Sequence, residues 1–170
     1  MRLALPPVTS LPPSSSGDLG RADPALVEAL AAYADEGVVE PVIVALSGAR
    51  LLLAVMATPG EIEIADATGL PAESTAEVAV VFMQRRDGRK ALLAFSGLDT
   101  LTAWNPQARP VPVSARGAAQ AVLADGADAM LIDVAGPAMC VLETDAVGHL
   151  AAGHVLAGIS SGGYVWLAEG

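Results

Sequence analysis

The residues that most readily carry chemistry in this chain are one cysteine and two histidines. Cys140 lies in the apolar run 138–142, with no adjacent His or Lys to lower its thiol pKa, so we expect a buried side chain and no nucleophile. His149 and His154 are five residues apart, whereas two ligands on one helical face are three or four apart. We therefore expect no transition-metal site and no tightly bound cofactor.

Three carboxylates near one another in the sequence, Asp125, Asp128 and Asp133, suggest an acid–base pair. Each follows a predicted helix, turn or strand, so we interpret them as local hydrogen-bond acceptors. The Gly- and Ser-rich segment 158–163 lacks the Lys-Ser/Thr pair and the helix of a phosphate-binding loop. It predicts a turn before a short C-terminal strand or tail.

Two groups of residues are candidates for an interaction surface. Arg85, Arg86 and Arg89 cluster at a predicted turn; a solvated turn is the simpler interpretation, and docking of an acidic surface is the alternative. Phe95 and Trp104 flank a predicted helix and are expected in the core, with the wall of a shallow groove as the alternative.

The composition limits the classes of protein to consider. The 170 residues with a net charge of −10 fit one domain that repels phosphate backbones, so we expect neither nucleic acid nor an anionic membrane as a partner. Ala is the most frequent residue in the hydrophobic fraction of 53%, the aromatic fraction is only 4%, and polar or Gly residues interrupt each long apolar run. With no signal peptide and a lone Cys, we expect a cytoplasmic protein.

The residue pattern predicts a Pro- and Ser-rich flexible arm over residues 1–21 and an α+β domain over 22–157, followed by the turn and tail at 158–170. We expect a single domain in which helices pack on a largely antiparallel sheet, with a mixed sheet as the alternative. The predicted helices are 24–36, capped by Asp23 and ended by Gly37, then 98–104, 115–124 and 145–152, the last two capped by Ser114 and Thr144.

Runs of β-forming residues predict three hairpins. They are 39–46 with 51–57, 77–84 with 90–95 across the Asp87-Gly88 turn, and 129–134 with 138–142. A brief edge strand is predicted at 61–64 and an extended segment at 110–113.

Several motifs in a fixed order resemble one family. The run 88–104 (GRKALLAFSGLDTLTAW) is followed by 109–113 (RPVPV), and further matches occur at 49–55, 126–128, 131–133 and 135–137. Together they resemble the SseB N-terminal-domain family in its actinobacterial form, over roughly 23–153. The chain departs from the family at Ala54, Leu93 and Val134, where members usually have Pro, and at Ser96-Gly97, where they have Thr-Ser. The resemblance supplies no catalytic residues, because the family name records a serine-sensitivity phenotype.

Two hypotheses about function follow. The first is a non-catalytic binding or regulatory module with a protein partner, self-association included. The second is a small-molecule enzyme, linked to serine by the family name alone, in which residues such as Asp133 and Arg116 would converge in a pocket. A deep pocket with convergent ionisable groups would favour the enzyme, and an exposed apolar patch the binding module.

Overall fold

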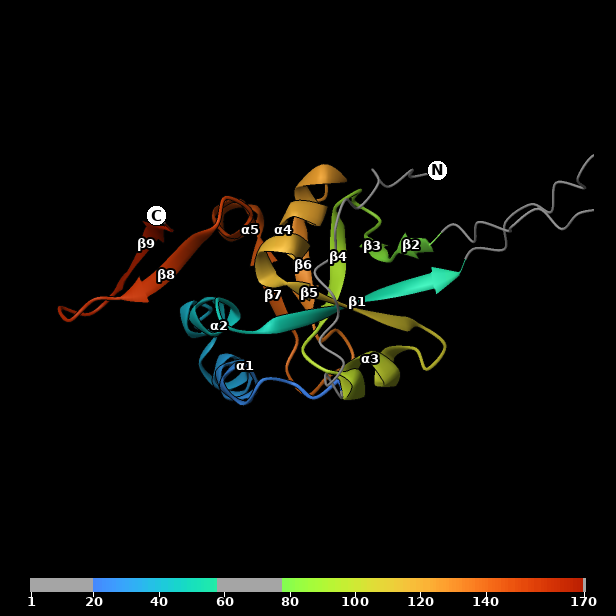
Figure 1. Cartoon of the computed structure of the whole chain (residues 1–170), viewed down its shortest axis with the longest axis horizontal. Coiled ribbons are helices and arrows are strands. Elements are labelled where there is room, and N and C mark those ends of the chain that lie inside the picture. The colour runs from blue at the N-terminus through green and yellow to red at the C-terminus, as the bar shows by residue number, and fades with distance from the viewer. Residues whose placement is uncertain (1–19, 58–77, 170) are drawn as a thin grey trace, which may run out of the picture.

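The computed structural model describes residues 20–57 and 78–169 (Figure 1). Most of the predicted arm and the predicted strand at 61–64 therefore lie outside the described residues. The helices are α1 (Pro24–Glu36), α2 (Glu40–Leu46), α3 (Leu98–Trp104), α4 (Ala115–Ala124) and α5 (Thr144–Ala151). The strands are β1 (Arg50–Ala57), β2 (Val78–Val80), β3 (Phe82–Gln84), β4 (Lys90–Phe95), β5 (Arg109–Ser114), β6 (Ala129–Ile132), β7 (Cys140–Glu143), β8 (His154–Gly158) and β9 (Tyr164–Ala168).

The fold class is confirmed as α+β, and the large sheet is mixed. Antiparallel pairs join β1 to β5, β1 to β2, β3 to β4 and β6 to β7, whereas β4 and β6 run parallel. β1 and β4 pair only through Leu52–Phe95 and Leu53–Ala94, and beyond that point they diverge. The two short strands β2 and β3, which meet at Val81, lie between the diverging parts of β1 and β4. There β2 pairs with β1 and β3 pairs with β4.

The first predicted hairpin is wrong in one half. Residues 51–57 form the predicted strand, but 40–46 form α2, with Val42, Ile43 and Leu46 buried. The three consecutive β-branched residues 42–44 suggested a strand. Glu40 and Pro41 in the first turn favour a helix start, and burial of one helical face outweighs the weak β propensity.

The predicted strand 77–84 is divided at Val81 into β2 and β3, and most other predicted elements are close to those observed. Asp23 caps α1 by accepting from the amides of Ala25 and Leu26 at 2.9 and 3.2 Å, and Gly37 ends that helix at φ 72°. Ser114 caps α4 by accepting from the Gly117 amide. Thr144 is not the cap of α5 but its first residue, and its hydroxyl donates to the Asp128 carbonyl at 2.5 Å.

The sheet is covered on both faces, which explains its nearly continuous apolar strands. Leu51 and Leu53 of β1 lie in a core that packs under α1, α2, α4 and α5. Leu52 and Ala54 point to the opposite face, where they join a smaller core with Phe95 and Leu101 under α3. Alternate residues of one strand therefore serve different helices.

The chain ends in a two-stranded sheet of its own. β8 and β9 pair antiparallel and extend away from the large sheet (Figure 1), with Leu156 of β8 in the main core. The turn predicted at 158–163 is confirmed, because the Ile159 amide donates to the Gly163 carbonyl and Gly162 and Gly163 have φ of 83° and 113°. No helix in 20–57 or 78–169 is long and apolar enough to cross a membrane.

Candidate functional site

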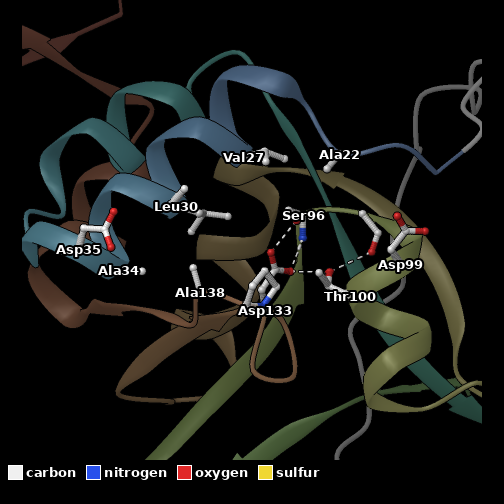
Figure 2. Close-up of a pocket in the computed structure, with 13 residues that line it drawn as sticks. Ala22, Val27, Leu30, Ala34, Asp35, Ser96, Asp99, Thr100, Asp133 and Ala138 are labelled. Carbon is white, nitrogen blue, oxygen red and sulfur yellow. Dashed lines mark hydrogen bonds between the residues drawn. The ribbon is translucent and has the colours of Figure 1, made fainter.

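The described residues form a half-open cavity of about 490 Å³ between α1, the start of α3 and the loop after β6. Its walls are mostly apolar, with Val27, Leu30 and Ala34 of α1 facing Ala138. Figure 2 shows Ser96, Thr100 and Asp133 together at its centre, with Asp35 and Asp99 on opposite sides of them. The volume lies within the roughly 300–1,000 Å³ of ordinary small-molecule sites.

Two parallel strands bring Ser96 and Asp133 together. Ala94 of β4 is in register with Ile132 of β6, so the residues just beyond these strands leave the sheet at the same edge. The Asp133 amide donates to the Ala94 carbonyl at 3.0 Å, which continues the strand pairing by one step. The carboxyl ends of parallel strands are a common place for ligand sites.

Asp133 is the centre of the site. Its side chain accepts from the Ser96 amide at 2.8 Å, from the Ser96 hydroxyl at 2.6 Å and from the Thr100 hydroxyl at 2.6 Å. The residue is only 3% exposed and has a left-handed φ of 55°, a conformation that Asp and Asn adopt more easily than other non-glycine residues. These bonds fix the loop after β6 to the first turn of α3.

Ala22 lines the same cavity, at the end of a segment, 20–22, that is held against α3 and β1. The Leu98 amide donates to the Gly20 carbonyl at 2.7 Å, and the Arg50 guanidinium donates to the carbonyls of Arg21 and Ser96 at 2.7 and 3.0 Å. A Cβ on Gly97 would lie 2.9 Å from the Ala22 amide nitrogen. The close approach of this segment therefore depends on glycine at position 97.

The electrostatic character of the cavity is acidic. Three carboxylates line it, from Asp35, Asp99 and Asp133, and its described lining includes no Lys, Arg or His. Asp133 has its oxygens occupied by hydroxyl and amide donors, whereas Asp35 and Asp99 are exposed. The cavity therefore favours a positively charged group near its two exposed carboxylates.

The three aspartates singled out from the sequence do not converge. Asp125 forms an ion pair with Lys90, and Asp128 accepts from the Lys90 amide at 2.8 Å, so both lie at the start of β4. Asp133 lies at the other end of that strand. Asp125 forms an ion pair, and Asp128 and Asp133 accept hydrogen bonds, all with residues more than 30 positions away, so their interpretation as local acceptors was wrong.

The basic residues at the β3–β4 turn are largely paired with carboxylates. Arg85 lies 3.5 Å from Asp87, and the Arg89 guanidinium donates to Glu143 at 2.7 Å. Arg86 is exposed at the same turn. The predicted Asp-Gly turn is confirmed, with Gly88 at φ 90°. These neighbouring acids reduce the local positive potential, which supports the solvated-turn interpretation.

Phe95 and Trp104 belong to the smaller core. Phe95 is completely buried, and its ring centroid lies 5.6 Å from that of the partly buried Trp104. Leu101 completes this contact, whereas Leu98 is 38% exposed and lies against Gly20. Neither aromatic ring lines the cavity described above.

Cys140 is completely buried, as expected. Burial first, and then the Asp133 carboxylate, raise the pKa of its thiol to about 12. A thiol of this kind is almost fully protonated at neutral pH, which agrees with a structural role.

The two histidines are closer than their sequence spacing suggested. α5 ends at Ala151, Gly153 turns the chain at φ 82°, and β8 brings His154 back until the two Nδ1 atoms are 2.8 Å apart. The His149 ring also stacks on Trp166 with centroids 4.4 Å apart. The described residues contain no group of three or more His, Cys, Asp or Glu that could hold a metal ion.

Comparison with known protein families shows which family the chain belongs to. The family model for the SseB protein N-terminal domain matches residues 26–149, most of the chain. The chain belongs to the SseB N-terminal-domain family. Comparisons with the curated proteins and with the solved structures gave no significant match.

The family match includes the whole Asp133 cluster and leaves out β8 and β9. Of the cavity residues, the sequence alone singled out Asp133, as one of three neighbouring carboxylates, and as a possible member of an enzyme pocket. Ser96 and Thr100 were missed, although both lie in the run 88–104 that carries the resemblance. Asp35 and Asp99 gave no signal, since isolated acidic residues on helices are ordinary surface residues.

Proposed function

We propose that this SseB-family domain is a non-catalytic binding module whose ligand enters the cavity between α1, α3 and the loop after β6. The observation that carries the proposal is the combination of apolar walls with two exposed carboxylates, Asp35 and Asp99, on either side of Asp133. Such a cavity suits an amine or guanidinium carried on a short apolar chain. A free diamine and a Lys or Arg side chain of a protein partner share that chemistry.

The hydrogen bonds of Asp133 support a role without catalysis. A general base must be free to accept a proton from its substrate. Asp133 is only 3% exposed and its two oxygens already accept three hydrogen bonds from Ser96 and Thr100, so it presents little acceptor surface to a ligand. The cluster therefore serves to hold the cavity in shape.

The alternative, a small-molecule enzyme, has one observation in its favour. Three carboxylates do converge on the cavity, which is the feature expected of an enzyme pocket. Arg116, the other residue expected in the enzyme pocket, lies instead against Gly153. A Cβ added to Gly153 would lie 3.1 Å from Arg116 Nη1. Conversion of a bound ligand, followed by NMR over hours, would support the enzyme and overturn the non-catalytic module.

A binding experiment tests the proposal. Agmatine and cadaverine represent free cations, a short Lys-rich peptide represents a protein partner, and glutarate is the anionic control. We expect cations to bind and glutarate not to, and the better of the two cationic arms identifies the source. Failure of both arms, or preference for glutarate, would overturn the proposal.

Matched variants locate the binding. Asp99→Asn and Asp35→Asn each remove one exposed charge and should weaken cation binding about two- to fivefold, the effect of an exposed charge pair. Ala34→Phe fills the cavity from α1 and should abolish binding. Glu28→Gln removes an exposed charge from α1 outside the lining and should leave the affinity unchanged.

A further inference from the structure

The β8–β9 hairpin has one face made entirely of aliphatic side chains. In its register Val155 pairs with Leu167 and Ala157 with Val165, so these four residues share a face. Leu167 is 50% exposed and Val165 is 40% exposed. The other face is anchored to the domain, because Leu156 is buried and Trp166 packs against the main core and His149. The aliphatic face is therefore held in place, with Val165 and Leu167 exposed and Val155 and Ala157 half-buried.

This surface differs from the rest of the chain in charge. Residues 146–168 include no Asp, Glu, Lys or Arg, whereas the whole chain has a net charge of −10. A contact centred on the hairpin lets two copies meet without bringing carboxylates together, while most other approaches set acidic surfaces against each other. An exposed aliphatic patch without charge is also a known mark of an interaction site.

We propose that the occupant of this face is the same face of a second copy, so that the domain forms a two-fold symmetric dimer through β8 and β9. A two-fold axis places identical patches in contact, and a flat patch of Val, Ala and Leu side chains is complementary to itself. The inference does not depend on the proposed ligand, because the hairpin does not line the cavity.

The size of the patch sets the strength of the dimer. Two strands of five residues, about 17 Å long, offer a few hundred Å² of apolar surface. A standard stable interface buries about 800 Å² on each partner. The dimer should therefore be weak and concentration-dependent.

Sedimentation analysis of the full chain over a wide concentration range tests the proposal. We expect a shift from monomer to dimer, and Leu167→Glu should raise the dissociation constant at least tenfold. Leu123→Glu is the matched control, because Leu123 on α4 is 46% exposed and lies outside the hairpin. Circular dichroism and thermal melting confirm that both variants fold.

A cross-linking experiment tests whether the dimer contact lies on the hairpin. Cys140 is the chain's only cysteine and is buried, so Leu167→Cys adds one accessible thiol. Mild oxidation should link this variant into a covalent dimer much faster than a Leu123→Cys variant. A chain that stays monomeric up to about 1 mM, where even the weakest specific contacts appear, would overturn the proposal. A segment of the same chain that covers the face would keep the chain monomeric, and this outcome would overturn the proposal. A dimer whose dissociation constant is unchanged by Leu167→Glu would refute the proposal too.

Discussion

Removal of the Asp133 side chain is the most direct test of how the cavity is held together. In Asp133→Ala the Ser96 amide and the Ser96 hydroxyl lose their acceptors, and Ser96 is only 2% exposed, so water cannot readily replace them. The Thr100 hydroxyl lies 3.1 Å from the Gly97 carbonyl and so keeps one acceptor. A buried donor without an acceptor costs about 1–3 kcal/mol. With the two Ser96 donors left unpaired, the unfolding free energy should fall by about 4 kcal/mol.

Urea denaturation of the wild type and the variant measures this loss. Asp133→Asn should lose about half as much, roughly 2 kcal/mol, because asparagine tolerates the left-handed backbone and keeps one acceptor oxygen. Glu28→Ala is the control, an exposed carboxylate on α1 whose removal should change stability by less than about 0.5 kcal/mol. A loss under about 1 kcal/mol in Asp133→Ala, with an unchanged denaturant slope, would refute the assigned role.

Three further predictions concern single residues. Gly97→Ala should lower the unfolding free energy by about 1–3 kcal/mol in urea, while Gly48→Ala, where a Cβ would meet nothing within 4 Å, should stay close to wild type. Trp104→Ala should cost roughly 2–4 kcal/mol by the same measurement, and a smaller loss would show that its contact with Phe95 contributes little. Because the Cys140 thiol has a pKa of about 12 against an ordinary 9.0, the unfolded state loses this proton first, so its stabilising contribution should fall between pH 9 and 12. Cys140→Ala should remove that part of the alkaline loss in pH-dependent denaturation, and an identical pH profile for both proteins would contradict it.

Local signals predicted most of the fold. The Asp23 and Ser114 caps, the Asp87-Gly88 turn and the breaks at Gly37 and Gly126 act within a few residues of the chain, so the sequence displays them directly. α2 was mistaken for a strand because a run of β-branched residues can be buried in either conformation. Only tertiary packing decides between the two.

The site could not be predicted in the same way, because it depends on pairing between distant residues. Ser96 and Asp133 are 37 residues apart and meet because β4 and β6 happen to lie parallel and adjacent. The two histidines show the same limit, since a turn at Gly153 brought them together although their helical spacing argued against it. Residue spacing reports contacts within one element, while these contacts depend on the order of strands and on the path of the chain between elements.

The close approach of residues 20–22 to Gly97 explains one departure of this chain from the family pattern that it resembles. Where members usually have Thr-Ser, this chain has Ser96-Gly97, and the hydroxyl at 96 is retained and donates to Asp133. At position 97 any side chain would press against the Ala22 amide at 2.9 Å, so glycine allows the segment to close over the strand ends. A serine there would hold residues 20–22 farther away and open the cavity on that side. The residue at position 97 therefore determines how closely residues 20–22 approach the cavity, while the hydroxyl at position 96 bonds to Asp133 at the centre of the cavity.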